Sequence, residues 1–230
     1  MKTIGLIGGM SWESSIEYYR IINEEVKRQL GGLHSAKCIL YSFDFDEIER
    51  YQAKGDWDRA GQALAEAALS LEQAGADMIV ICTNTMHKVI DDIREKITIP
   101  ILHIADAAVK KIQNSKLTRV GLLGTKYTMT EDIYTSRIEA TGIEVLIPDN
   151  EEIEQINRII YEELCLGTIN QTSKEYFQKV IENLVAKGAQ GIILGCTEIG
   201  LLVKPEDSEV PLFDTAVLHA MEAVNQSLDK

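Results

Sequence analysis

The chain has 230 residues, of which 45% are hydrophobic and 26% charged, the composition of an ordinary globular protein that buries a core. Its formal net charge of −13, from 23 basic and 36 acidic residues without a Lys/Arg cluster, argues against nucleic acid as a partner. No apolar segment approaches the length of a membrane span, which argues against a membrane role.

The first residues run directly into a strand-like segment without a signal-peptide pattern, and the four cysteines form no CxxC pair. Disulfides are rare in the reducing cytoplasm, where such thiols stay free. We therefore expect a cytoplasmic protein with reduced cysteines.

The first half of the chain alternates apolar strand segments with amphipathic helices. Strands are expected at residues 2–7, 37–43, 78–82 and 99–103, and helices at 12–30, 58–74, 83–97 and 105–113. This alternation predicts βαβ units in a parallel sheet. The turn at Gly8-Gly9 offers backbone N–H groups to an anion. Because the GxGxxG fingerprint is missing, we expect a small carboxylate there rather than a dinucleotide.

From residue 119 the pattern restarts. RVGLLGTKYT at 119–128 repeats the character of TIGLIGGMSW at 3–12, and KGAQGIILGCTE at 187–198 repeats AGADMIVICTNT at 74–85. A third pair, 100–102 and 211–213, follows in the same order. These repeats predict an α/β fold of two duplicated αβα lobes with parallel sheets, related by pseudo-two-fold symmetry, with the active site in the cleft between them.

We assign residues 1–103 plus 214–230 to the N-terminal lobe and residues 104–213 to the C-terminal lobe. The last helix, from about residue 216, is expected to return to the first lobe. Within the second lobe, helices are expected at 132–140, 152–166 and 173–187, and a strand at 144–146.

The corresponding strand ends of the two repeats carry different nucleophile candidates. When the Gly-Ala pairs that precede these strands are aligned, Thr83 falls on Cys196. Cys196 precedes an expected helix start, whose N–H groups and dipole favour a thiolate, whereas the nearby Glu198 opposes it. Cys82 matches a glycine and points away from Thr83 by strand alternation, so we interpret it as a core residue.

The remaining cysteines and two histidines have simpler interpretations. Cys38 and Cys165 lie inside a strand pattern and a helix pattern and are expected in the core. His87 and His103 lack metal-ligand spacing and are expected to form hydrogen bonds, so no metal is implied.

Four motifs spread over nearly the full length carry a resemblance to a known family: GGMSWES, ICTNTMH, GTKYTM and GCTEIGLLV. With these motifs the chain resembles the aspartate/glutamate racemase family. The resemblance implies an enzyme that needs no cofactor and uses two cysteines on opposite faces of its substrate. Cys196 matches the family's second cysteine, but Thr83 stands at the position of the first. A lysine that some members carry in the stretch matching residues 162–167 is also absent.

The resemblance implies an amino-acid racemase for aspartate or glutamate that strongly prefers the L-enantiomer, because Cys196 is the only catalytic thiol. Thr83 then either relays a proton poorly or shapes the opposite face. The residues expected to bind the substrate are Met10, Gln52, Asn84, Thr85, Thr125, Thr197 and Glu198. A homodimer through the first helix and residues 37–43 is also implied.

Other classes of function stay open at this point. One is a dicarboxylate-binding protein that has lost turnover along with the first cysteine. Another is a related enzyme, a hydantoin racemase or a maleate isomerase.

Overall fold

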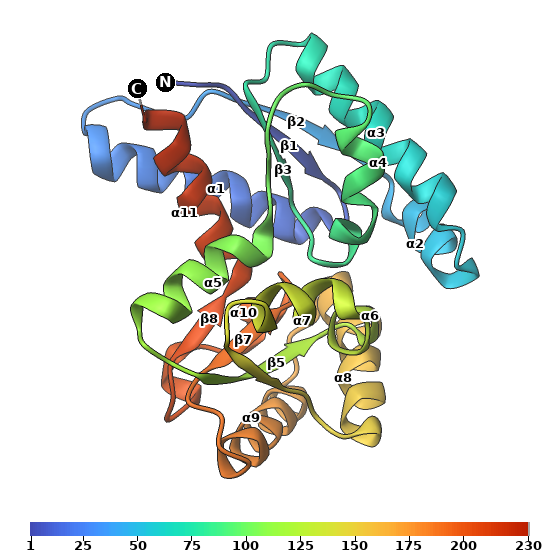
Figure 1. Ribbon diagram of the computed structural model, residues 1–230, viewed down its shortest axis with the longest axis vertical. Helices are drawn as coiled ribbons and strands as arrows, with labels where there is room; N and C mark the ends of the chain where they lie inside the picture. Colours follow the sequence, from blue (N-terminus) through green and yellow to red (C-terminus); the bar gives the residue numbers. More distant parts are fainter. Residues whose placement is uncertain (230) are drawn as a thin grey trace. The chain divides into compact units, whose positions relative to one another are not determined.

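The computed structural model describes residues 1–229 (Figure 1). The chain divides into two compact units, Met1–Ile104 with the segment from His219 onward, and Ala105–Leu218. The sequence placed these boundaries after residues 103 and 213. The later second boundary reflects helix α11 (Thr215–Leu228), which starts in unit 2 directly after the last strand and ends in unit 1.

Unit 1 is built on a four-stranded parallel sheet in the order β2-β1-β3-β4. Helices α1 and α11 lie on one face of this sheet, and α3 and α4 lie on the other (Figure 1). Its elements are β1 (Ile4–Gly8), α1 (Trp12–Leu30), β2 (Cys38–Ser42), α2 (Phe45–Lys54), α3 (Trp57–Gln73), β3 (Met78–Ile81), the 3₁₀ helix η1 (Thr85–Val89), α4 (Ile90–Arg94) and β4 (Ile101–Leu102).

The core of unit 1 fills the space between the sheet and α3 and α4. Ile79 and Ile81 of β3 belong to one buried cluster with Leu64 of α3 and Ile93 of α4. The small residues of α3, such as Ala68, let the helix approach the strands closely. Full burial of each large aliphatic side chain contributes about 1.5–3 kcal/mol, so this layer holds the strands in register.

Unit 2 repeats the same topology, with strand order β6-β5-β7-β8 and every pair parallel. The predicted α/β fold of two duplicated units with parallel sheets is thereby confirmed. Its elements are α5 (Ile104–Asn114), which begins at the unit boundary, β5 (Arg119–Gly124), α6 (Lys126–Thr130), α7 (Asp132–Glu139), β6 (Glu144–Leu146), α8 (Asn150–Glu162), η2 (Leu164–Leu166), α9 (Gln171–Ala186), β7 (Ile192–Gly195), α10 (Ile199–Leu202), η3 (Pro205–Asp207) and β8 (Leu212–Asp214).

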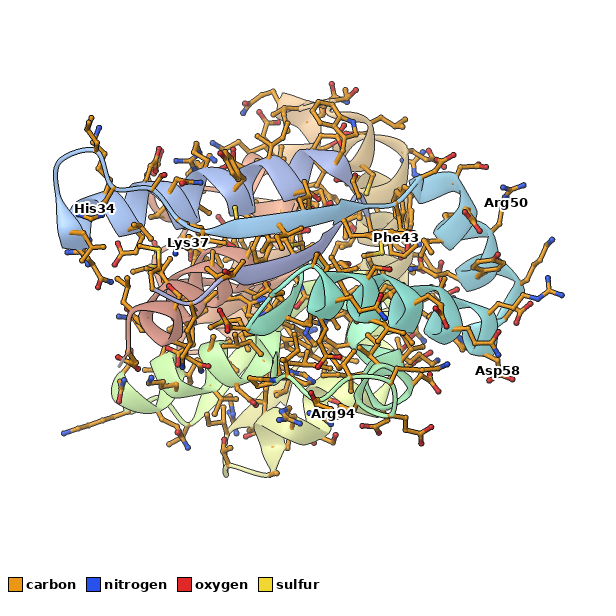
Figure 2. All side chains as sticks on the ribbon, turned by 90° about the horizontal axis from the view of Figure 1, so that it is seen from above. His34, Lys37, Phe43, Arg50, Asp58 and Arg94 are labelled. Carbon is orange, nitrogen blue, oxygen red and sulfur yellow. The ribbon has the colours of Figure 1, made fainter. Side chains whose placement is uncertain are left out.

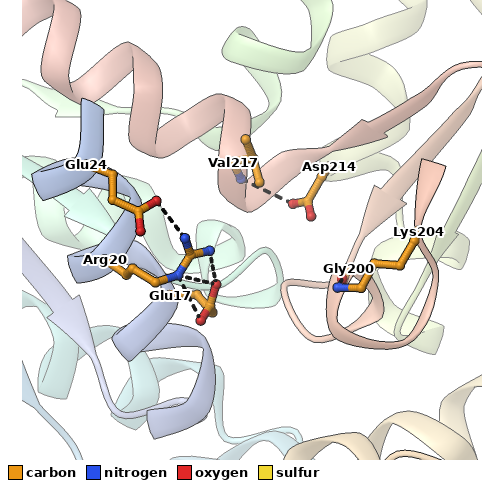
Figure 3. Close-up of polar contacts among 7 residues, drawn as sticks. All are labelled: Glu17, Arg20, Glu24, Gly200, Lys204, Asp214 and Val217. Atoms are coloured by element: carbon orange, nitrogen blue, oxygen red, sulfur yellow. Dashed lines mark hydrogen bonds and ion pairs between the residues drawn. The ribbon is translucent and has the colours of Figure 1, made fainter. Parts of the chain in front are cut away.

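Several helix ends are fixed by local capping contacts. In unit 2, Asp214 Oδ1 accepts hydrogen bonds from the N–H groups of Ala216 and Val217 at 3.0 and 3.2 Å and so begins α11 (Figure 3). Lys204 Nζ donates to the carbonyl of Gly200 at 2.6 Å beside the end of α10. Such contacts satisfy backbone groups that a helix terminus leaves without partners.

The surface of α1 carries an ion-pair ladder within unit 1. The guanidinium of Arg20 donates to Glu17 and to Glu24, each with a shortest distance of 2.6 Å (Figure 3). These pairs are exposed and contribute little to stability. Between residues 1 and 229, none of the helices combines the length and apolar character needed to cross a membrane.

Candidate active site

Polar residues follow two paired strands at one edge of the unit 2 sheet. The last residues of β5 and β7, Gly124 and Gly195, are register partners, so Thr125 and Cys196 follow at the same carboxyl edge. This edge is where ligands bind in open α/β sheets. Thr125 caps α6, since its side chain accepts a hydrogen bond from the N–H of Thr128 at 3.3 Å.

A thiol, a hydroxyl and a carboxylate converge at the end of β7. Cys196 Sγ donates a hydrogen bond to Glu198 Oε2 at 2.9 Å, and Thr197 Oγ1 donates to the same oxygen at 2.7 Å. All three residues are buried, with Glu198 only 2% exposed. Glu198 therefore holds its carboxylate directly against the Cys196 thiol in a site with little access to water.

The expectation that a helix start favours the Cys196 thiolate is wrong for the resting site. Burial raises the pKa of Cys196 well above its usual value, and the Glu198 carboxylate raises it further. The helix that follows, α10, has only one turn and begins three residues later, so its dipole contributes little. The thiol is therefore protonated at neutral pH and needs an acceptor for its proton.

The glycine before Cys196 lies in a tightly packed place. A Cβ on Gly195 would lie 2.8 Å from Leu122 Cδ1 and 3.0 Å from the carbonyl oxygen of Leu123. The repeat matches this glycine to Cys82, which is buried directly after β3 in unit 1.

The matching strand end in unit 1 carries Thr83, Asn84 and Thr85. Thr83 and Asn84 are buried, and Thr85 opens the 3₁₀ helix η1. The N–H of Cys82 continues the pairing of β3 with β1 by donating to the carbonyl of Ile7 at 2.9 Å. This pairing brings the glycine-rich segment after β1, which includes the buried Met10, to the same edge as Thr83.

Gln52 reaches this edge from α2. Its Nε2 lies 3.0 Å from the sulfur of Met86 in η1, and its side chain is buried. Unit 1 therefore gathers five of the predicted site residues at one sheet edge, namely Met10, Gln52, Thr83, Asn84 and Thr85, and unit 2 gathers Thr125, Cys196, Thr197 and Glu198 at its own.

The four cysteines are all free thiols, and their settings differ. Cys82 is 1% exposed, and burial raises its pKa, as expected for a core residue. Cys38 and Cys165 are only half-buried, so the prediction that both lie in the core is wrong. Cys165 in η2 lies near enough to Cys196 for its charge to raise the pKa of that thiol. The helical pattern of the sequence gave no signal for this proximity.

Among the side chains that the structure describes, no group of three or more from His, Cys, Asp or Glu is arranged to hold a metal ion. The strand end of unit 2 holds the thiol of Cys196, the carboxylate of Glu198 and hydroxyl groups, and the strand end of unit 1 holds hydroxyl, amide and N–H donors. This set suits the binding of a small carboxylate and the movement of a proton.

The chain is similar to known proteins over nearly its whole length. A family model for Asp/Glu/hydantoin racemases matches residues 7–223. The solved structure of a candidate Asp/Glu racemase from Yersinia pestis is 58% identical in sequence and matches with a TM-score of 0.92, covering 100% of both chains. An aspartate racemase homologue from Pyrococcus horikoshii is 37% identical, with a TM-score of 0.84 and coverage of 100% of both chains. The broad specificity amino-acid racemase RacX of Bacillus subtilis is 27% identical over 75% of this chain and 74% of its own length.

Proposed function

The chain belongs to the Asp/Glu/hydantoin racemase family, and from that premise we propose that it is a cofactor-independent racemase that prefers L-aspartate or L-glutamate. One observation carries this proposal: the thiol of Cys196, which follows β7 at the ligand-binding edge of its sheet, donates a hydrogen bond to the buried carboxylate of Glu198. Removal of an α-proton needs such a base, held away from water.

The proposed reaction begins with transfer of the Cys196 proton to Glu198 over 2.9 Å. The thiolate then takes the α-proton of the substrate, so an S–H bond forms while the Cα–H bond breaks. The electron pair moves into the α-carboxylate, and N–H and hydroxyl donors stabilise the resulting oxyanion. Return of a proton from Cys196 to the same face regenerates the L-enantiomer. Transfer of the hydroxyl proton of Thr83 to the opposite face gives the D-enantiomer, after which solvent returns a proton to the Thr83 oxygen and takes up the proton held by Glu198.

Thr83 occupies the position of the second catalytic group in this proposal, because the sequence repeat matches it to Cys196. A threonine hydroxyl stays protonated near neutral pH, so it can deliver a proton more readily than it can remove one. We therefore propose that abstraction from the L-enantiomer is efficient and abstraction from the D-enantiomer is slow.

The substrate-binding role predicted for Glu198 changes in this mechanism. An ionised carboxylate only accepts hydrogen bonds, so it cannot hold a carboxylate of the substrate. We propose that the acidic substrate instead meets donors from the two strand ends, namely Met10, Gln52, Asn84, Thr85, Thr125 and Thr197.

The test is a substrate panel analysed by chiral chromatography. L-aspartate and L-glutamate are expected to yield their D-enantiomers, and Cys196→Ala is expected to yield none. Because the relative RacX is described as having broad specificity, neutral amino acids belong in the same panel. Turnover of maleate or hydantoins in place of amino acids would contradict the proposal.

The presence of Thr83 at the position of the family's first cysteine favours one alternative function: a protein that binds a dicarboxylate without turnover. In that case aspartate raises the melting temperature, but its α-hydrogen does not exchange with solvent. The two measurements on one sample separate binding from catalysis.

We also propose that the chain forms a homodimer through α1 and β2. Trp12, Ile16 and Tyr19 are exposed on α1 at spacings of four and three, which puts them on one helix face. Leu40 and Tyr41 are exposed on the edge strand β2, which runs from beside Lys37 to Phe43 next to α1 (Figure 2). Light scattering should give twice the chain mass, and Ile16→Glu combined with Leu40→Lys should give the monomer mass.

A further inference from the structure

Three buried imidazoles form a cluster in unit 1 that the proposed reaction does not use. His87, His103 and His219 are 1%, 6% and 0% exposed. The ring centroid of His87 lies 4.6 Å from that of His103 and 5.9 Å from that of His219. Tyr18 of α1 meets His219 edge to face at 5.7 Å. We call these four residues the histidine cluster.

The hydrogen bonds of the cluster determine where its protons lie. The carbonyl of Leu102 can only accept, so His219 Nε2, 3.1 Å away, carries a proton. Burial lowers the pKa of His219 to about 3, so the ring is neutral at neutral pH. With its single proton on Nε2, His219 accepts at Nδ1 from the hydroxyl of Tyr18 at 2.9 Å.

His87 has the opposite tautomer. The backbone N–H of Ile104 can only donate, so His87 Nε2 accepts from it at 3.1 Å. The proton of His87 lies on Nδ1, which donates to the carbonyl of Thr83 at 2.9 Å. One imidazole thus joins the backbone of Thr83 to the backbone of Ile104.

These contacts fall at the two places where the chain changes units. The chain leaves unit 1 after Ile104 and re-enters it at His219. His87 accepts a hydrogen bond from the N–H of Ile104, the last residue of this segment of unit 1. His219 donates a hydrogen bond to the carbonyl of Leu102, two residues earlier. The turn that carries Thr83 is therefore tied through His87 to the point where the chain passes to unit 2.

We infer that His87 is a positioning residue, whose two ring nitrogens fix the Thr83 turn relative to Ile104 and thereby set the Thr83 hydroxyl for proton delivery. This inference rests on the proposed function, because it assigns proton delivery to Thr83. A displacement of about 1 Å at a reacting group can lower a rate by about a hundredfold, so loss of one such bond is enough to matter.

Two conservative variants test separately the hydrogen bond of His87 to Thr83 and its hydrogen bond to Ile104. In His87→Asn, the side-chain amide can replace Nδ1 as donor to Thr83 but cannot reach Ile104. In His87→Gln, the amide oxygen can replace Nε2 as acceptor from Ile104 but leaves the carbonyl of Thr83 without its donor. Both variants place an amide in the same buried site, so each is a control for the stability of the other.

The α-hydrogen of L-aspartate or L-glutamate can exchange in deuterated water with retention or with inversion of configuration. The quantity to measure is the fraction of exchange events that give the D-enantiomer. We expect His87→Gln to lower this fraction about tenfold, while exchange with retention, which depends on Cys196, changes less than about twofold. His87→Asn should stay closer to the native fraction. Equal fractions in the native protein and His87→Gln would overturn the inference.

A second pair of measurements does not depend on turnover. In the Thr83→Cys background, adding His87→Gln should raise the alkylation rate of the introduced thiol by iodoacetamide about tenfold over adding His87→Asn, measured on its own peptide by mass spectrometry. ¹⁵N NMR should find the proton of His87 on Nδ1 and that of His219 on Nε2. Equal alkylation rates or the reverse tautomers would overturn the inference even if no amino acid is racemised.

Discussion

The thiol of Cys196 donates its hydrogen bond to Glu198 Oε2 at 2.9 Å, and both side chains are buried. A proton that moves along this bond converts a thiol and a carboxylate into a thiolate and a carboxylic acid without changing the charge of the pair. Burial and Glu198 both raise the pKa of Cys196, so loss of the proton to solvent is disfavoured. Transfer within the pair provides the thiolate that the proposed reaction needs.

The Glu198→Gln variant tests this pairing through the pH dependence of thiol reactivity. In the native protein, internal transfer should make the alkylation rate of Cys196 by neutral iodoacetamide vary little around neutral pH. In Glu198→Gln the proton must leave to solvent, so the rate should rise about tenfold per pH unit below the pKa of the thiol. Thr197→Val removes the other hydrogen bond to Oε2 and should keep the native profile. Parallel profiles for the native protein and Glu198→Gln would refute the pairing.

The assignment of the catalytic thiol is tested by two matched alanine variants. Cys196→Ala should lower α-hydrogen exchange of the L-substrate by about 10²–10⁴-fold, the typical contribution of a positioned base. Cys82→Ala should exchange at nearly the native rate, because this thiol is 1% exposed at a core position. If the Cys82 variant loses activity and the Cys196 variant keeps it, the alignment of the two repeats is wrong.

The lowered pKa of His219 should make the stability of the protein depend on pH. Because its pKa is lowered to about 3 in the folded protein, from 6.5, the unfolded chain binds more protons between these values. The contribution of His219 to the free energy of unfolding should therefore be fully present above pH 6.5. Below that pH the free energy of unfolding should fall by about 1.4 kcal/mol per pH unit toward pH 3. Urea titrations of the native protein and His219→Gln should differ by this slope. An identical slope in both proteins would show that His219 is not held neutral.

The Gly9→Ala variant should lose much of the stability of the native protein. Its φ of 83° lies in the left-handed region, and a Cβ there would collide with the backbone of Phe43. The conformational strain of about 1–2 kcal/mol adds to an overpacking cost of about 1–3 kcal/mol. Gly142→Ala is the control, since its φ is 82° but nothing lies within 4 Å of the added Cβ. Denaturant unfolding should show a smaller loss for Gly142→Ala, and equal losses would rule out the collision with Phe43.

Most of the sheet architecture follows from the sequence. The apolar runs at 78–82 and 119–124 became β3 and β5, and the repeated order of motifs corresponds to the repeated strand order of the two sheets. Helix α2 (Phe45–Lys54) was missed although Phe45, Ile48 and Tyr51 recur every three residues and pack on the core, because the prediction considered only the acidic residues of this stretch. The expected helix at 83–97 is instead a 3₁₀ helix followed by the short α4.

The chemistry of the site was harder to foresee. Cys82 is buried, as expected for a core residue. The sequence predicted that Glu198 opposes a thiolate at Cys196, but it did not predict the direct hydrogen bond between the two side chains, because residues two apart do not share a face on a helix. They meet here because residues 196–198 form a turn between β7 and α10 rather than the start of a long helix. For His87 the sequence predicted hydrogen bonding but not the partners, one of which, the N–H of Ile104, lies 17 residues away in the chain. The contacts of His219 were not predicted, since its partner Leu102 lies 117 residues away.

The most direct test of the central proposal is α-hydrogen exchange in deuterated water, followed by proton NMR on both enantiomers of aspartate and glutamate. A single thiol at Cys196 with a hydroxyl at Thr83 predicts rapid exchange of the L-enantiomer and slow exchange of the D-enantiomer, and Thr83→Cys should accelerate the D-enantiomer selectively. Equal exchange rates for the two enantiomers in the native protein would contradict it.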